Sequence, residues 1–196
     1  MENTLPFKPS PKARANLRAG SVYAIDGGDS HVYFGQIALD KTVGFFKYRS
    51  TNISNIEKVL ERPLMSRFGV NYQSIGLALR AGNWLNLGKF HLNVELSTIP
   101  FVVQWPFGTL EVTIWRGNEE VGKTKIHDPK IQNYEVISSY DAVEHVAERL
   151  RGDFEGGNDA WQSGGPVWRM RLKKEKLAER FPSQPGHALP EDWVYV

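Results

Sequence analysis

The chain has 196 residues and no cysteine, and its 24 Lys and Arg against 22 Asp and Glu give a formal net charge of +2. This length fits one domain with or without appended segments, and a hydrophobic fraction of 41% is enough for a folded core. The lack of cysteine excludes disulfides, thiolate catalysis and cysteine-ligated zinc or iron–sulfur sites. So small a net charge does not by itself indicate a nucleic-acid partner.

The N-terminal part of the chain predicts an arm followed by a β-meander. Residues 1–17 contain three prolines among polar and basic residues, which is typical of a mobile, extended arm. Alternating apolar residues predict strands at 21–25, 32–39 and 43–48. The Gly- and Asp-rich residues 26–30 predict a turn, so the three strands should pair antiparallel.

The middle of the chain predicts a short helix and several strands. Residues 54–60 have helical spacing and precede Pro63. Residues 67–72 and 74–80 read as extended, and 81–90 as a strand or a packed loop. Three further segments are strand candidates: 101–105, 109–115 and 121–126.

The clearest helix is Asp141–Arg151. Asp141 and Glu144 have the spacing of a capping box, and Gly152 is predicted to end the helix. Its apolar stripe consists of Val143, Val146, Ala147 and Leu150. A second helix is predicted over Trp168–Phe181. Together these elements predict an α+β fold, a mainly antiparallel curved sheet with the Asp141–Arg151 helix packed on it.

One segment matches a phosphate-loop pattern, G-x-x-x-x-G-K-[ST], at residues 117–124. The chemistry of that loop requires a helix that opens at Lys123, but Pro129 follows too soon for one. Glu119 and Glu120 would also place negative charge inside the phosphate site. The sequence therefore favours a β-hairpin with a polar tip over a nucleotide site.

No pattern in the chain selects a metal site or a catalytic group. Two sets of residues could contribute to a metal site, Asp26 with Asp29 and His31, and Asp141 with His145 and Glu148. The first is better explained as a solvated hairpin tip and the second as a solvated helix face. The G-x-S-x-G motif of α/β-hydrolases is absent. We therefore predict no catalytic residue, no metal and no cofactor, and a protein that is not an enzyme.

Charge is unevenly distributed along the chain. Residues 1–20 carry four basic and one acidic side chain, residues 21–160 carry 14 basic and 17 acidic, and residues 161–196 carry six basic and four acidic. The acidic excess is largest between residues 141 and 159. Its carboxylates are Asp141, Glu144, Glu148, Asp153, Glu155 and Asp159. Such a surface can attract a basic partner, although ordinary solubility explains it equally well.

The stretch 169–180 contains six basic residues near Trp161 and Trp168, as in some nucleic-acid-binding segments. Glu175 and Glu179 interrupt it, so the sequence favours a solvated helix.

The beginning and end of the central region resemble the bacterial immunity protein 26 family. The first strand, Gly20-Ser-Val-Tyr-Ala-Ile25, a Gly/Asp turn and the strand Val32-Tyr-Phe-Gly-Gln-Ile37 resemble the family's opening, with Ser21 where Asp is usual. The segment 140–154, with Trp161 after it, resembles the family's closing helix. The resemblance covers about residues 18–162. It implies an immunity-type α+β domain there, with a mobile basic arm at 1–17 and an extra basic tail at 163–196.

Members of this family belong to polymorphic toxin and contact-dependent inhibition systems, so the resemblance implies a function. It implies a cytoplasmic protein that neutralises a cognate toxin domain, such as a nuclease, by stoichiometric binding. The acidic residues predicted to bind the toxin are Asp141, Glu144, Glu148, Asp153 and Glu155, and Trp161 is predicted to be a central contact. The alternative is a nucleic-acid-binding accessory protein that uses the 169–180 stretch. Since no apolar run is long enough to span a membrane and no secretory signal is visible, we expect a cytoplasmic location without a membrane partner.

Overall fold

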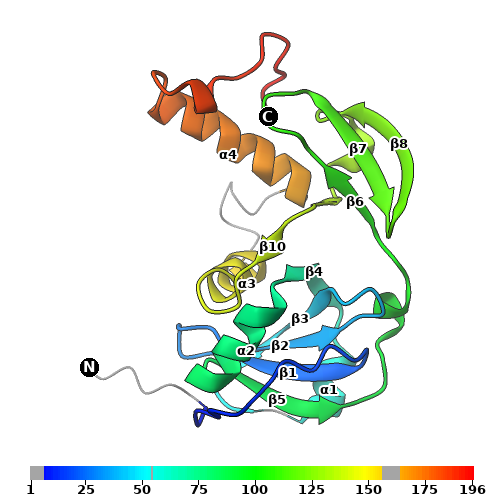
Figure 1. The fold of residues 1–196 in the computed structure, drawn as a ribbon, viewed down its shortest axis with the longest axis vertical. Helices are drawn as coiled ribbons and strands as arrows, with labels where there is room; N and C mark the ends of the chain where they lie inside the picture. The colour runs from blue at the N-terminus through cyan, green and yellow to red at the C-terminus, as the bar shows by residue number, and fades with distance from the viewer. Residues whose placement is uncertain (1–6, 54, 156–163) are drawn as a thin grey trace. The chain divides into compact units, whose positions relative to one another are not determined.

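The computed structural model describes residues 7–53, 55–155 and 164–196 (Figure 1). The chain divides into two compact units. The first comprises Met1–Ile99 and Ser138–Phe154, and the second comprises Pro100–Ile137 and Glu155–Val196. Each unit thus combines two separate stretches of chain, and neither coincides with the predicted segments 18–162 and 163–196.

The first unit is built on a six-stranded, mostly antiparallel sheet. Its order is β10-β4-β3-β2-β1-β5, and only the β10–β4 pair is parallel. Register shifts in three of the strand pairs increase the local twist, which helps to curl the sheet into a half-barrel. The first three predicted strands are confirmed. The strands are β1 Ser21–Asp26, β2 Val32–Ile37, β3 Val43–Ser50, β4 Leu64–Val70, β5 Trp84–Lys89 and β10 Ser139–Tyr140.

Three α-helices and one 3-10 helix accompany this sheet. They are α1 Ile56–Leu60, α2 Tyr72–Ala81, α3 Val146–Glu155 and the 3-10 helix η1 Val94–Ser97. The predicted α+β fold, with a helix packed on a curved sheet, is confirmed, because Val146 and Leu150 of α3 are buried in the core of this unit. None of the helices in the described ranges has the length and apolar character needed to span a bilayer.

Helix α2 corrects the prediction that residues 74–80 are extended. The side chain of Asn71 accepts hydrogen bonds from the backbone of the first turn, and Gly82 ends the helix with a left-handed φ of 86°. Ile75, Leu77 and Leu79 alternate in the sequence and so imitate a strand. In the structure the residues that α2 buries in the core are Ile75, Ala78 and Leu79, which share one helix face, and Leu77 is 51% exposed.

Helix α3 begins and ends later than the predicted helix Asp141–Arg151. The backbone N–H of His145 donates to the carbonyl of Asp141 at 3.0 Å, but residues 142–145 form a turn and α3 itself begins at Val146, five residues after the predicted start. The prediction that Gly152 ends the helix is wrong, because α3 continues to Glu155. The ring of Phe154 packs edge-on against Tyr33 at a centroid distance of 6.0 Å, and this contact holds the last turn on the sheet.

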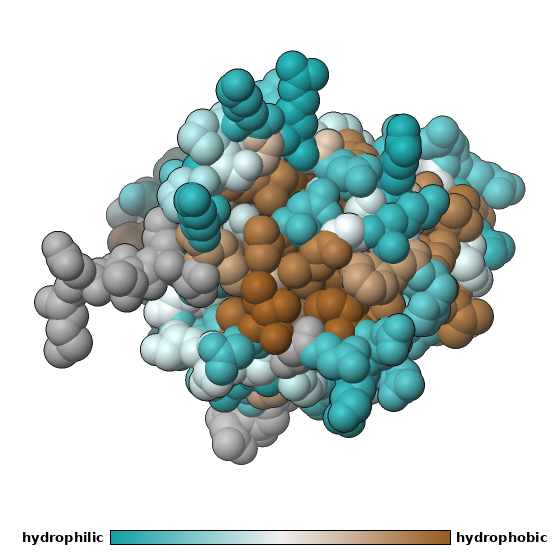
Figure 2. Space-filling view, turned by 90° about the horizontal axis from the view of Figure 1, so that it is seen from below, coloured by the Kyte–Doolittle hydropathy of each residue, from teal (hydrophilic) through white to brown (hydrophobic). Residues whose placement is uncertain are grey.

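Apolar clusters lie on both faces of the sheet. One cluster unites side chains of β1–β4 with helices α2 and α3, and the other unites the opposite side of these strands with α1. Phe7 is 5% exposed within the second cluster, and Tyr23 donates its hydroxyl to the Asn16 carbonyl at 2.9 Å. The described part of the predicted mobile arm is therefore packed on the first unit. Other apolar side chains remain at the surface, as Figure 2 shows for one face.

The second unit contains a four-stranded sheet in the order β8-β7-β6-β9 and the helix α4. The β7–β8 hairpin turns at Gly117, which has a φ of 63°, and Lys123 lies within β8. A strand thus occupies the place where a phosphate loop needs a helix, and the predicted hairpin is confirmed. The elements are β6 Phe101–Gln104, β7 Glu111–Arg116, β8 Glu119–Lys125, β9 Glu135–Val136, α4 Pro166–Arg180, and the 3-10 helices η2 Pro129–Ile131 and η3 Pro185–His187.

Two apolar residues of the predicted tail 163–196 lie in the core of the second unit. Val167 at the start of α4 and Trp193 near the C-terminus are buried with Val103 of β6, Val112 of β7 and Ile126, which directly follows β8. Helix α4 is therefore held by the same apolar cluster as strands β6 and β7. Charge composition, which separates the basic tail from the acidic body, does not indicate this packing.

Replacement of a core leucine of α3 tests the position of this helix. Leu150→Ala removes a fully buried side chain and should lower the free energy of unfolding by about 2–5 kcal/mol. Leu77→Ala on the exposed face of α2 is the matched control and should cost about 0.5 kcal/mol or less. Chemical denaturation followed by circular dichroism measures both, and equal losses would contradict the described packing of α3.

Candidate protein-binding surface on helix α3

The turn before α3 is held by hydrogen bonds to two other elements. Trp84 of β5 donates its indole N–H to the Ala142 carbonyl at 3.2 Å, and the Ala142 N–H donates to the Ser74 hydroxyl of α2 at 2.8 Å. The carboxylate of Asp141 accepts from the backbone N–H groups of Val143 and Glu144 at 2.8 and 3.1 Å. Asp141 thus caps the turn that leads into α3, and its charge is directed to the backbone.

The inner side of α3 uses another of the predicted carboxylates. Arg149 donates through Nε to Asp153 at 2.6 Å and through Nη1 to the Tyr140 hydroxyl at 2.7 Å. Its guanidinium lies 4.9 Å from the centre of the Phe68 ring, and the side chain of Asp153 is only 3% exposed. Asp153 is therefore an internal ion-pair partner rather than a surface charge.

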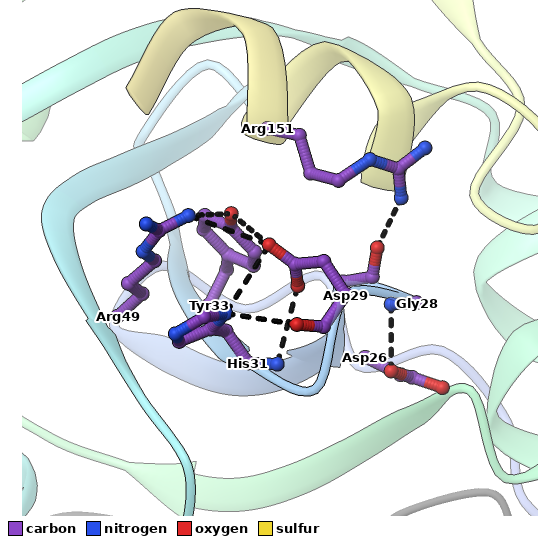
Figure 3. A network of polar contacts seen from close by, with 8 residues as sticks. Asp26, Gly28, Asp29, His31, Tyr33, Arg49 and Arg151 are labelled. Atoms are coloured by element: carbon purple, nitrogen blue, oxygen red, sulfur yellow. Dashed lines mark hydrogen bonds and ion pairs between the residues drawn. The ribbon is translucent and has the colours of Figure 1, made fainter. Parts of the chain in front are cut away.

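A second polar network fixes the other end of the helix (Figure 3). Asp29 in the β1–β2 turn accepts from the Tyr33 hydroxyl at 3.0 Å and from Arg49 of β3 at 3.4 Å. Arg151 of α3 donates to the carbonyl of Gly27 in the same turn. These contacts connect the C-terminal half of α3 to the β1–β2 turn, which is bonded in turn to strands β2 and β3.

The Phe154 ring adds a cation–π contact to this network. The Arg49 guanidinium lies 4.4 Å from the centre of that ring, so Arg49 contacts both Asp29 and α3. Burial of the Asp29 carboxyl would raise its pKa. The hydrogen bonds from Tyr33 and the His31 backbone, with the charge of His31, outweigh burial and hold the pKa of Asp29 below its usual value. Burial raises the pKa of Tyr33.

The structure gives no support to either candidate metal site. Within residues 7–53, 55–155 and 164–196, no group of three or more His, Asp or Glu side chains is arranged to hold a metal ion. Asp29 and His31 instead bond within their own turn, where the His31 N–H donates to the Asp29 carboxylate at 3.1 Å. This is the hairpin-tip arrangement that the sequence favoured.

Three glutamates remain on the outer side of the segment. Glu144, Glu148 and Glu155 are all exposed. Glu148 and Glu155 are seven residues apart and share one face of α3, and Glu144 lies in the turn just before the helix. We call these three residues the acidic face. Val143, which is 41% exposed, lies next to Glu144 in the chain.

The structure thus separates the predicted toxin-binding residues into internally bonded and exposed ones. Asp141 and Asp153 bond internally, and Glu144, Glu148 and Glu155 form the acidic face. Trp161, the predicted central contact, lies outside the described residues.

Sequence reasoning missed the residues that hold α3 in place. The Arg149–Asp153 pair has an i, i+4 spacing, so a search for helical ion pairs could have found it. No local signal indicates the bond from Arg151 to Gly27, because the two residues are 124 positions apart.

Comparison with protein-family models, with curated proteins and with solved structures found no match to this chain. The resemblance of residues 18–162 to the immunity protein 26 family therefore stays a prediction from the quoted motifs.

Replacement of Asp29 tests the network that supports α3. Because the pKa of Asp29 is lower in the folded chain than its usual value near 3.9, its carboxylate stabilises the fold above that pH. This stabilisation is lost as the pH falls through the lower, folded value. Asp29→Asn should therefore cost about 1–3 kcal/mol at pH 7, and the cost should shrink as the carboxyl of the parent protein becomes protonated.

Chemical denaturation across the acidic range measures this effect. The matched control is Glu61→Gln, which changes an exposed carboxylate and should have little effect at any pH. A cost for Asp29→Asn that does not change between neutral and strongly acidic pH would show that Asp29 does not act through its charge.

Proposed function

We propose that this chain is an immunity protein that binds and neutralises a cationic bacterial toxin domain through the acidic face of α3. The single observation that carries the proposal is the exposure of Glu144, Glu148 and Glu155 along one side of a firmly held segment. Such a protein acts stoichiometrically, so binding alone is sufficient for its function. The resemblance of residues 18–162 to an immunity family supports the same class of partner.

The electrostatics of the acidic face suit a nuclease as the toxin. A nuclease must be cationic along the groove that holds its substrate, because the phosphate backbone dominates nucleic-acid affinity. A row of carboxylates can attract that groove over a distance and then occupy it. Val143 adds apolar surface at one end of the row, as protein interfaces commonly require.

The supports of α3 contribute to affinity indirectly. Leu150 is buried in the core, and Arg149 and Arg151 bond to residues of the same unit. Because the helix is already ordered, binding does not have to include the entropic cost of forming it. Asp141 and Asp153 belong to these supports, so the proposed contact set is narrower than the sequence predicted.

Charge reversal on the acidic face tests the proposal. The probe is the C-terminal domain of a large secreted protein encoded immediately upstream, the gene arrangement that immunity proteins imply. Glu144→Lys with Glu148→Lys should slow association with this domain by about tenfold or more at low ionic strength. The association rate should also depend less on salt, and the dissociation rate should change less than the association rate. Surface plasmon resonance over a series of salt concentrations measures these rates.

Glu57→Lys with Glu61→Lys is the matched control, since these two carboxylates are also exposed and four residues apart. This variant should bind like the parent protein. Parent-like association of the α3 variant would rule out the acidic face as the interface. If the parent chain neither binds the toxin domain nor restores growth to cells that produce it, the proposed function is wrong.

A further inference from the structure

The second unit carries a basic face on α4 that has no role in the proposed function. Arg169, Lys173, Lys176 and Arg180 follow one another at spacings of four, three and four residues. These spacings place them on one side of the helix, over about 16 Å. Lys173, Lys176 and Arg180 are exposed and Arg169 is half-buried. We call these four residues the basic face.

The opposite side of α4 faces the core of the second unit. Val167 is fully buried there, and Arg171 donates to the Val194 carbonyl at 2.7 Å and to the Gln132 side chain at 3.0 Å. Burial lowers the pKa of the Arg171 guanidinium, although Glu175 opposes this effect. Arg171 therefore has a structural role, whereas the basic face points away from this packing.

The carboxylates of α4 do not interrupt the basic face. Glu175 accepts from the Trp193 indole N–H and from the Val196 backbone N–H, both at 2.8 Å. Its charge is thus directed to the C-terminal segment. Glu179 lies about a quarter of a turn around the helix from the basic residues. The sequence alone counted both glutamates against a nucleic-acid partner, and the hydrogen bonds of Glu175 to the C-terminal segment weaken that objection for Glu175.

A cavity of about 650 Å³ adjoins the basic face, and Lys176 belongs to both. Its other walls include the side chains of Tyr195, His187, Leu172 and Leu189. Tyr195 is 71% exposed, so its ring is accessible to a flat partner. Glu175 and Glu179 also line this cavity and would repel a phosphate inside it, but carboxylates accept hydrogen bonds from the amino groups of bases.

We propose that the basic face of α4 and the adjoining cavity bind single-stranded nucleic acid, with phosphates on the basic residues and a base against Tyr195. A linear array of cations beside an accessible aromatic ring is the combination that binds single strands without strong sequence preference. An acidic protein is a poorer candidate for the partner, because it would pair with the cations but would leave the Tyr195 ring and the cavity without a role.

Fluorescence anisotropy with a labelled, mixed-sequence single-stranded oligonucleotide tests this inference, with the duplex of the same sequence in parallel. Four phosphate contacts predict a slope of about −3 for the logarithm of affinity against the logarithm of salt concentration. That slope corresponds to a roughly 50-fold loss between 50 and 200 mM salt. We expect the single strand to bind more tightly than the duplex. Absence of binding at low salt would overturn the proposal.

Two variants separate the phosphate contacts from the base contact. Lys173→Gln with Lys176→Gln should reduce the salt slope to about half. Lys125→Gln with Lys130→Gln removes two exposed charges of the same unit and is the matched control, which should keep the parent slope. Tyr195→Ala should weaken single-strand binding by about fivefold or more without changing the slope.

An equal loss in the control variant would show that the charge of the unit as a whole, and not the basic face, attracts the oligonucleotide. The proposed base contact would be overturned if the duplex bound as tightly as the single strand and Tyr195→Ala left the single-strand affinity unchanged. Glu144→Lys with Glu148→Lys should not weaken oligonucleotide binding. Failure of the toxin-binding proposal and failure of this one can therefore be distinguished.

Discussion

The first unit depends on one constraint, which is that its curled sheet is apolar on both faces. In β1 the side chains of Tyr23 and Ile25 point to one cluster, and those of Val22 and Ala24 point to the other. A sheet of this kind needs a cover on each side, because exposed apolar faces are costly in water. Helices α2 and α3 cover one face, and α1 with Phe7 helps to cover the other. The position of α3 therefore follows from the burial of the apolar side chains on one face of the sheet.

This constraint also decides which carboxylates can act at the surface. Once Val146 and Leu150 are buried, the helical period directs Asp153 inward to Arg149 and leaves Glu148 on the outer side, while Glu144 is exposed in the turn before the helix. A charge count along the chain treats all of these residues alike. The structure separates those that support the helix from those that a partner can contact.

Local patterns in the sequence were sufficient where local chemistry decides the structure. The β1–β2 hairpin follows from its Gly and Asp turn residues and the β7–β8 hairpin from Gly117-Asn118, and Asp141 caps the turn that leads into α3. Helix α2 was missed because alternation of Ile75, Leu77 and Leu79 imitates a strand, although the cap at Asn71 was visible in the sequence. Contacts between distant residues, such as Arg151 with Gly27 or Trp193 with Glu175, have no local signature.

The sequence predicted where the two candidate surfaces lie along the chain, but not which of their side chains a partner can contact. Composition located the acidic segment and the basic segment, because clusters of charge are visible in any sequence. It could not show that Glu175 bonds to the C-terminal segment, nor that Arg149 pairs with Tyr140 across the core side of α3, because both facts depend on the fold. The proposed contact sets on α3 and α4 therefore rest on packing, and their chemistry rests on the residues that packing leaves outside.

The most direct test of the central proposal is carboxyl labelling of the complex between this chain and the toxin domain. A water-soluble carbodiimide with an amine label modifies accessible carboxylates, and mass spectrometry locates the modified residues. Glu144 and Glu148 are exposed in the free chain and should lose most of their labelling in the complex, while Glu57 and Glu61 keep theirs. Unchanged labelling of Glu144 and Glu148 in a complex that still neutralises the toxin would contradict the assignment of the acidic face as the binding surface.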